Sequence, residues 1–199
     1  EKERLYKLLN DTFNENKMAN SLKLSDEERM YLKDLNLLTL KPMIYVLNVS
    51  ELDAQKNYTQ KGIIGDYDNV QISAKIESEL AVLDENERME YMQEFGMIES
   101  GLDRIIKKCY DLLGLQTYLT AGPKEVRAWT VKKGDTAPKA AGKIHTDFER
   151  GFISAEIVNF EDLKQVMSMK IAKDKGLVRL EGKNYVMRDG DVVEFNFNV

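Results

Sequence analysis

The stretch Lys41-Pro42-Met43-Ile44-Tyr45-Val46-Leu47-Asn48-Val49-Ser50-Glu51 decides how the first half of this chain folds. Pro42 ends any preceding helix because it has no backbone N–H, and Met43 to Leu47 is a short apolar run rich in β formers. Such a run predicts a strand that is buried on both faces, as in a parallel α/β sheet. The polar residues Asn48 to Glu51 then follow at the carboxyl end of that strand.

Helical patterns lie on both sides of this strand. Residues 1–36 carry leucines at helical spacing, and Ser25 with Glu28 forms a capping box, so we expect two antiparallel helices joined by residues 14–24. Downstream, Val70-Gln71-Ile72 predicts a second strand, and further helices are expected over residues 76–83, 85–95 and 102–113. Two parallel strands with three helices cannot shield both faces of a sheet, so we expect neighbouring strands to come from elsewhere.

The apolar pattern changes from a helical period to alternation at Gly114, where we place a domain boundary. Strands are expected over residues 118–120, 125–131, 152–158, 177–180, 184–187 and 192–197, and helices over 137–150 and 161–172. Asp189-Gly190 supplies a turn before the last strand. Mixed strands around one or two helices predict an α+β module for residues 114–199, after an α/β region.

Composition and charge narrow the class of protein. The 199 residues hold 29 Lys+Arg and 34 Asp+Glu, which gives a net charge of −5. Residues 114–199 hold 14 Lys+Arg and 12 Asp+Glu, so the second half is slightly basic. The second half is compatible with RNA but too weakly basic to demand it, and DNA is not an expected partner. No apolar run approaches the about 20 residues of a membrane helix, and the single Cys109 and His145 cannot build a Cys/His zinc site. We expect a cytoplasmic protein without membrane contact.

Phosphate-binding motifs are missing from the sequence. Neither Gly142-Lys143 nor Gly182-Lys183 lies in a G-x-x-x-x-G-K-[ST] loop, and no G-x-G-x-x-G occurs. A single histidine also leaves nucleophile-and-base catalysis without its usual partners. We therefore assign no catalytic residue and no metal ligand. Because the chain starts at Glu1 within a helical pattern, we expect it to begin inside a longer protein.

Two polar loops follow the two predicted strands directly. Asn48 to Glu51 follows the first and Ser73-Ala74-Lys75 the second, and the carboxyl ends of adjacent parallel strands are where open α/β sheets bind ligands. GTPases use an N-K-x-D loop there, whose Asp accepts from guanine N1–H and the N2 amine, and an S-A-[KL] loop that brings a backbone N–H to O6.

The first loop departs from the GTPase pattern at two positions. Val49 replaces the Lys, and Glu51 replaces the Asp, whose carboxylate would move by about 1 Å and lose a bidentate fit. A site in which Asn48 meets N7 and N6 of adenine, and Val49 lies against the purine ring, should tolerate adenine. The alternative is that Asn48 to Glu51 is a plain turn and that Ser73 is a helix cap.

The sequence resembles the YchF-type subfamily of Obg-related P-loop NTPases over nearly its whole length. The resemblance rests on long motifs at residues 41–51, 115–122, 125–130, 140–153 and 179–185. It implies a base-recognition site made by Asn48, Val49, Glu51, Ser73, Ala74 and Lys75. It also implies ATP in preference to GTP, with Mg²⁺, and association with ribosomes and their RNA. The phosphate loop and the Mg²⁺ ligands would then precede Glu1, so that this chain alone would be inactive.

The resemblance also implies a division of the chain. Residues 1–36 correspond to the end of a helical, partly coiled-coil insertion, 37–113 to the C-terminal part of the nucleotide-binding P-loop NTPase (G) domain, and 114–199 to a TGS domain with a β-grasp fold. The alternative function is a non-catalytic module that contacts RNA or protein and binds no nucleotide.

The second half contains candidates of lower specificity. Lys124, Arg127, Lys132 and Lys133 could touch RNA phosphates, with Trp129 or Tyr118 stacking on a base, although a solvated strand face and a core aromatic explain them equally well. His145 and Asp147 could be an acid/base pair, but positions i and i+2 of one helix point apart. We therefore favour a role for them in capping or bracing the turn before Phe152.

Overall fold

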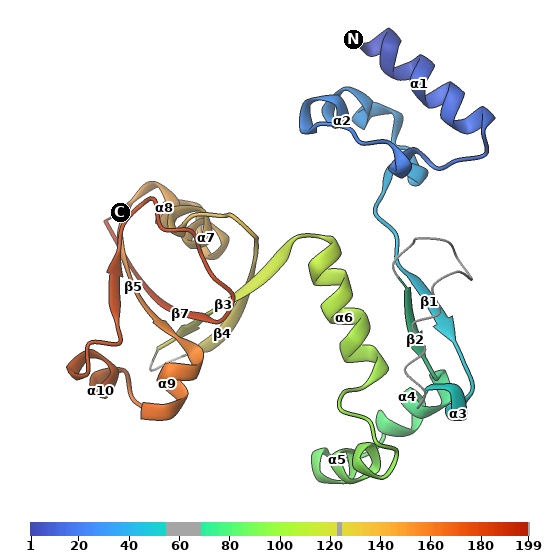
Figure 1. The fold of residues 1–199 in the computed structure, drawn as a ribbon. Helices are drawn as coiled ribbons and strands as arrows, with labels where there is room; N and C mark the ends of the chain where they lie inside the picture. Colours follow the sequence, from blue (N-terminus) through green and yellow to red (C-terminus); the bar gives the residue numbers. More distant parts are fainter. Residues whose placement is uncertain (55–68, 123–124, 199) are drawn as a thin grey trace. The chain divides into compact units, whose positions relative to one another are not determined.

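The computed structural model of the protein describes residues 1–54, 69–122 and 125–198 and divides the chain into two compact units, Glu1–Cys109 and Tyr110–Val199 (Figure 1). The division lies close to Gly114, where the sequence pattern changes. Both helices and strands occur in each unit, so the fold is mixed α/β. Among the helices of the described ranges, none is long and apolar enough to cross a membrane.

The first unit begins with helices that pack on each other. Its elements are α1 (Lys2–Asn14), α2 (Asp26–Leu32), β1 (Tyr45–Asn48), α3 (Glu51–Ala54), β2 (Asn69–Ile72), α4 (Ala74–Leu80), α5 (Glu85–Glu94) and α6 (Gly101–Leu112). Leu5 and Leu9 of α1 form a buried cluster with Ala19 and Leu32. The predicted capping box is confirmed, since Ser25 accepts from the Glu28 N–H and Glu28 accepts from the Ser25 N–H.

The second helix ends earlier than the sequence pattern suggested. After Leu32 the backbone tightens into a 3₁₀ turn, Lys33–Leu35, and Asn36 takes a left-handed conformation with φ of 47°. A left-handed residue stops a helix by redirecting its last carbonyls, and Asn tolerates that conformation better than most residues.

Strands β1 and β2 are parallel neighbours, in register from Tyr45 opposite Asn69 to Asn48 opposite Ile72. The parallel pair is therefore confirmed. The expectation that the first strand is buried on both faces is wrong, because Val46 keeps 45% of its surface exposed. Among the described residues only β2 pairs with β1.

Helices α4, α5 and α6 follow β2 as predicted, and side-chain hydrogen bonds tie α4 to α6. Glu77 of α4 accepts from the N–H groups of Gly101 and Leu102, at 2.7 and 3.2 Å, where α6 begins. Arg104 of α6 donates to the Gln71 carbonyl of β2 at 2.9 Å. The apolar stripe of α6 is less well covered, since Leu102 and Ile106 remain 52% and 47% exposed.

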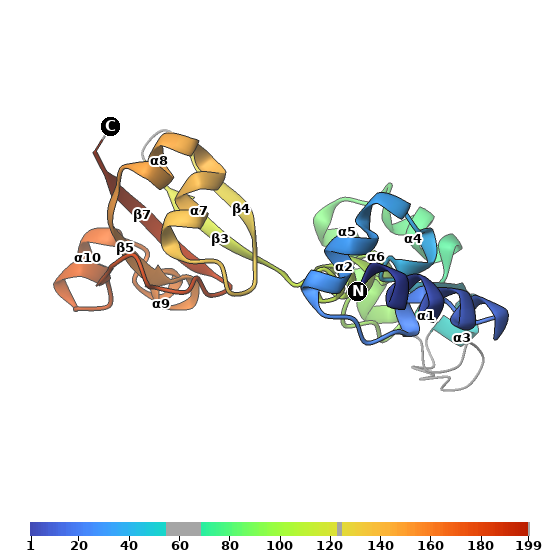
Figure 2. The same cartoon turned by 90° about the horizontal axis from the view of Figure 1, so that it is seen from above.

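The second unit is a five-stranded mixed sheet with helices packed against it (Figure 2). Its elements are β3 (Leu115–Ala121), β4 (Val126–Lys132), α7 (Ala137–Ile144), α8 (Thr146–Arg150), β5 (Phe152–Asn159), α9 (Phe160–Val166), α10 (Met169–Asp174), β6 (Arg179–Glu181) and β7 (Asp191–Phe197). The strand order is β4-β3-β7-β5-β6, in which β3 and β7 are parallel and the other neighbours are antiparallel.

The core of this unit lies between α7 and the sheet. Tyr118 of β3, Ile157 of β5 and Val193 of β7 are buried against Ala140 and Ala141 of α7. The small alanines let the helix approach the strands closely, and the Tyr118 hydroxyl donates to the Ala140 carbonyl at 2.9 Å. A second cluster joins Val158, Ala172 and Val192 to α9 and α10.

Three sequence expectations for this unit are wrong. The helix expected over residues 137–150 is broken at His145, which is extended, with φ of −157°. The helix expected over 161–172 is broken at Met167, which is left-handed, with φ of 54°. Residues 184–187 form no strand and contribute only an isolated bridge from Val186 to Thr136. In each case the chain turns so that its apolar residues stay on the core. The spacing of apolar residues along the sequence does not predict such turns.

Candidate functional site

The two loops expected to form a site lie side by side at the carboxyl ends of β1 and β2. The side-chain Oδ1 of Asn48 accepts from the Ala74 N–H at 3.0 Å, which links the loops directly. The Val49 N–H donates to the Ile72 carbonyl at 2.8 Å and continues the ladder one residue beyond the strand. Parallel pairing in this register therefore brings Asn48, Val49 and Ala74 together.

An ion pair makes a second link between the loops. The Lys75 ammonium contacts the Glu51 carboxylate, and Glu79, one turn further along α4, lies 4.0 Å from the same ammonium. The hydrogen bond to Glu51 is the main cause of a raised pKa at Lys75, and the charges of Glu51 and Glu79 act in the same direction. Lys75 therefore stays cationic and offsets the charge of Glu51.

Ser73 opens the second loop at the start of α4. It occupies the N-cap position of α4, yet its hydroxyl makes no capping hydrogen bond. Its surface is only 3% exposed, so the side chain itself does not face a ligand. What the Ser73-Ala74-Lys75 segment presents to solvent is Ala74 and Lys75, which are both exposed, while the Ala74 N–H is taken by Asn48.

The support behind these loops was not anticipated from the sequence. Glu77 fixes α4 to the start of α6, and Ser100 caps α6 by accepting from the Asp103 N–H at 3.0 Å. Tyr91 of α5 donates to the Glu79 carboxylate, which raises the pKa of Tyr91 to about 12. The spacing of Ser100 and Asp103 does signal a helix start, but no local pattern shows that Glu77 reaches it.

Known proteins resemble this chain in sequence and in fold. "Ribosome-binding ATPase YchF" of Bacillus subtilis is 49% identical over 199 residues, a match that covers 96% of this chain and 54% of the relative. "Obg-like ATPase 1" of Pongo abelii is 42% identical over 183 residues, covering 87% of this chain and 46% of the relative. The solved "Structure of the Schizosaccharomyces pombe YchF GTPase" matches with a TM-score of 0.80 and 32% identity, covering 98% of this chain and 53% of that one.

The chain belongs to the YchF family. A family model named YchF-GTPase_C, described as "Protein of unknown function (DUF933)", matches residues 115–198. The chain spans about half the length of the curated relatives it matches, and it corresponds to their C-terminal portion. The resemblance inferred from the sequence motifs is thus confirmed.

In this YchF-type chain the second unit holds the candidate RNA contacts. Tyr118 is completely buried, so the idea that it stacks on a base is wrong. Trp129 is half-buried; its Nε1–H donates to Thr120 at 2.9 Å, and the Arg127 guanidinium lies 4.2 Å from its ring centre. Lys133 pairs with Asp111 at 2.9 Å, Lys132 is exposed, and Lys124 lies outside the described residues.

His145 and Asp147 form a helix cap. The His145 Nδ1 accepts from the Asp147 N–H at 3.2 Å and lies 3.4 Å from the Asp147 carboxylate. The capping role favoured from the sequence is confirmed, although the reason differs: the two residues do not share one helix, because His145 is the N-cap of α8.

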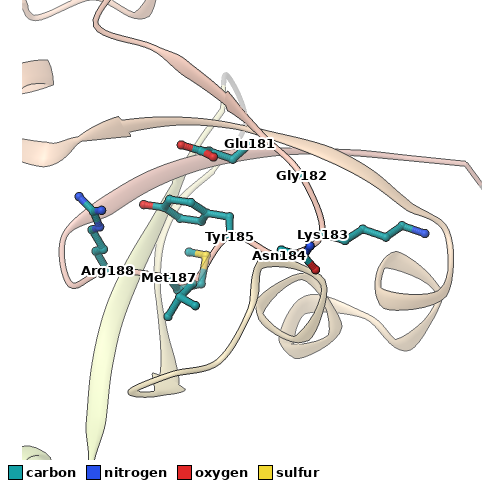
Figure 3. A pocket seen from close by; sticks show the side chains of 8 residues that line it. Glu181, Gly182, Lys183, Asn184, Tyr185, Met187 and Arg188 are labelled. Carbon is teal, nitrogen blue, oxygen red and sulfur yellow. The ribbon is translucent and has the colours of Figure 1, made fainter.

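A hollow in the second unit is lined by residues 181–188 (Figure 3). Beside it the buried Asp191 carboxylate accepts from the Tyr185 hydroxyl and from the Arg188 N–H, both at 2.8 Å. Arg179 donates to the same hydroxyl at 3.2 Å. This network holds the loop before β7 in place.

Within the ranges that the structure describes, no group of three or more His, Cys, Asp or Glu side chains could hold a metal ion.

Proposed function

We propose that this chain is the C-terminal part of a nucleotide-binding ATPase/GTPase, in which the two linked loops read a purine base. The carrying observation is that the Asn48–Ala74 hydrogen bond and the Glu51–Lys75 pair join two loops at the carboxyl ends of parallel neighbours. The names of the relatives, which include a ribosome-binding ATPase and a GTPase, support the same class of activity.

The Asn48 contact restricts what this side chain offers to a base. Oδ1 accepts from the Ala74 N–H, and the Nδ2 group is the donor that Asn48 offers to a base. A donor suits N7, which adenine and guanine share, but does not suit the N6 amine of adenine. Asn48 therefore positions either purine. Val49, half-buried beside it, packs against the ring.

The preference for ATP arises because the loops leave guanine without hydrogen-bond partners. Guanine needs an acceptor for N1–H and the N2 amine and a donor for O6. The Ala74 N–H is occupied by Asn48, and the Glu51 carboxylate is engaged by Lys75. Adenine lacks O6, the N1 proton and the N2 amine, so it loses nothing at these positions. GTP binds by the same loops, but less well.

The other parts take the roles that the family resemblance implies. Residues 1–36 are the end of the helical insertion, 37–113 the last part of the nucleotide domain, and 114–199 a TGS domain; the sheet order of the second unit and the helix α7 against it fit a β-grasp fold. The TGS and helical parts contact the ribosome in the cytoplasm. The phosphate loop and the Mg²⁺ ligands belong to a preceding segment, and this chain alone does not hydrolyse ATP.

The proposed site is tested by the nucleotide affinity of the full-length protein that contains this chain, called the parent below. Asn48→Ala should weaken ATP and GTP alike, by about tenfold for one lost hydrogen bond and the loosened loops. Glu51→Asp and Lys75→Ala should both raise GTP affinity relative to ATP. Glu90→Asp, an exposed change on α5, is the control. An unchanged base preference in both Glu51→Asp and Lys75→Ala, with unchanged affinity in Asn48→Ala, would remove the site assignment.

Ribosome co-sedimentation separates this function from the alternative of a nucleotide-independent interaction module. A nucleotide-controlled protein should sediment with ribosomes to different extents with and without ATP, and Asn48→Ala in the parent should reduce that difference. If the 199-residue chain sediments as fully as its parent, and nucleotide changes neither, the interaction module is the better description.

A further inference from the structure

The two edges of the five-stranded sheet differ in length. One edge is β6, which has three residues, Arg179–Glu181, and is too short to pair extensively. The other is β4, which has seven residues, Val126–Lys132, and among the described residues pairs on one side only, with β3 (Figure 2). A long edge strand presents unpaired N–H and C=O groups to solvent, and proteins commonly use or protect such edges.

The hydrogen bonds at its two ends show which β4 amides are unpaired. Gly122 N–H donates to the Glu125 carbonyl at 2.9 Å, and Lys133 N–H donates to the Gly114 carbonyl at 2.7 Å, so residues 125 and 133 face β3. Because backbone direction alternates along a strand, the amides of Val126, Ala128 and Thr130 point away from β3. The Lys132 N–H, which also points away, is capped by Asp135 at 3.0 Å and ends the open segment.

The side chains of these same residues leave the edge accessible. Val126 is 74% exposed, and Ala128 and Thr130 are also exposed. The Thr130 hydroxyl lies 3.0 Å from that of Tyr110, a contact on the sheet face that leaves the backbone edge open. An extended segment could therefore reach three successive outward-facing residues without displacing any side chain from a core.

The aromatic residues of this sheet argue against single-stranded RNA as the occupant. Base stacking needs an exposed ring, but Tyr118 is buried, and Arg127 already covers Trp129 at 4.2 Å. What β4 offers is backbone, and backbone pairing is the means by which sheets recognise extended peptides.

The charges on and beside the strand select the kind of peptide. Residues 125–133 hold three cations, Arg127, Lys132 and Lys133, and one carboxylate, Glu125. Lys133 is paired with Asp111 at 2.9 Å and Arg127 lies 3.8 Å from Glu125, so the positive charge along the edge rests on Arg127 and Lys132. The guanidinium of Arg127 is held by the Trp129 ring, which fixes a positive charge at the middle of the edge. A second copy of this chain would bring an equally positive edge against it, whereas an acidic segment is complementary.

We propose that β4 is a docking edge for an extended, acidic peptide segment of a partner protein, which adds to the sheet as a sixth strand along Val126–Thr130. This surface belongs to the second unit alone, and the proposal does not depend on nucleotide binding by the first.

A titration followed by nuclear magnetic resonance tests the docking edge. The probe is a synthetic eight-residue peptide in which Val or Thr alternates with Glu, added to the isotope-labelled 199-residue chain. We expect shifts centred on the amides of Val126, Ala128 and Thr130, with slowed hydrogen exchange at those three amides only. The same peptide with Lys in place of Glu should bind at least tenfold more weakly, and added salt should reduce the difference.

Two variants separate docking from folding. Ala128→Pro removes an outward N–H without removing a β3–β4 hydrogen bond, since proline is tolerated at strand edges; it should abolish binding while the spectrum of the remaining sheet is kept. If Ala128→Pro disturbs the fold, Arg127→Glu combined with Lys132→Glu should weaken binding at least tenfold on an intact backbone. Exposed Lys175→Glu is the charge control and should bind nearly as the parent does.

Several results would overturn the proposal. These are the absence of shifts at the three amides, binding that survives both the proline and the double charge variant, and oligouridine that binds this edge more tightly than the acidic peptide. Concentration-dependent dimerisation that Ala128→Pro abolishes, without peptide binding, would also overturn it and assign the edge to self-association.

Discussion

In the second unit five strands share one sheet around a continuous core, whereas the two parallel strands of the first unit have only each other among the described residues. Tyr118, Ile157 and Val193 are enclosed between sheet and helix. In the first unit Val46, on β1, and Ile106, on α6, are both close to half exposed. The second unit is thus held by apolar burial, and the first depends more on individual polar links.

Three of those polar links converge on α4. Lys75 joins it to Glu51, Glu77 joins it to α6, and Glu79 joins it to Tyr91 of α5. Single hydrogen bonds and exposed ion pairs contribute about 1 kcal/mol or less each, far less than a buried core residue. We therefore expect the unit with the candidate site to be the less stable one. Under the proposed function, the preceding part of the nucleotide domain covers its exposed faces.

Thermal unfolding should therefore show two transitions, of which the first unit gives the lower. Ile157→Ala, at a fully buried position, should destabilise the upper transition alone by about 2–5 kcal/mol. Leu80→Ala, also buried, should lower only the other transition. Calorimetry with both variants measures this. A single transition that moves with either substitution would mean that the units unfold together and that the comparison is mistaken.

Close backbone contacts provide a smaller, matched test in each unit. A Cβ at Gly151 would lie 2.0 Å from the Asn198 carbonyl oxygen, and one at Gly101 would lie 2.7 Å from Ile72 Cγ2. We expect Gly151→Ala to destabilise the second unit and Gly101→Ala the first, each by about 1–3 kcal/mol. Gly182→Ala meets nothing within 4 Å and is the control. Denaturant titration should show equal midpoints for Gly182→Ala and the parent; equal midpoints for all four proteins would contradict the packing.

The helical part of the first unit can be weakened through its capping box. Ser25→Ala removes the acceptor for the Glu28 N–H and should cost about 1 kcal/mol, seen as a lower first transition with an unchanged second. Ser78→Ala, at an exposed position within α4, is the control and should be neutral or slightly stabilising. A loss as large in Ser78→Ala as in Ser25→Ala would mean that the box contributes nothing.

Alkaline pH should weaken the first unit through Tyr91, with the smallest effect of these tests. Its pKa is raised from 10.0 to about 12, mainly by the hydrogen bond to Glu79. A raised pKa means that the folded state favours the protonated phenol, so this stabilisation is complete below pH 10 and is lost as pH rises through about 12. Tyr91→Phe should remove that part of the pH dependence. Identical profiles for Tyr91→Phe and the parent between pH 10 and 12 would show that the bond does not form.

The sequence predicted the elements whose signals are local. The capping box at Ser25, the parallel neighbours β1 and β2, and the alternation of Val193 and Phe195 in β7 all follow from patterns of a few residues. Breaks at His145 and Met167 were missed because both lie inside continuous apolar spacing, and only the need to follow the sheet makes the chain turn there. The assignment of Asn48, Val49, Glu51, Ser73, Ala74 and Lys75 to a purine site stays a prediction.

The sequence by itself determined the family, most of the helices and strands, and the loops that follow β1 and β2, because each depends on neighbours along the chain. Only the tertiary structure decided that Ala74 N–H is taken by Asn48, that Lys75 meets Glu51, and that Tyr118 is buried while β4 keeps an open edge. These are contacts between segments 10 or more residues apart, and their geometry depends on how strands pair and helices pack.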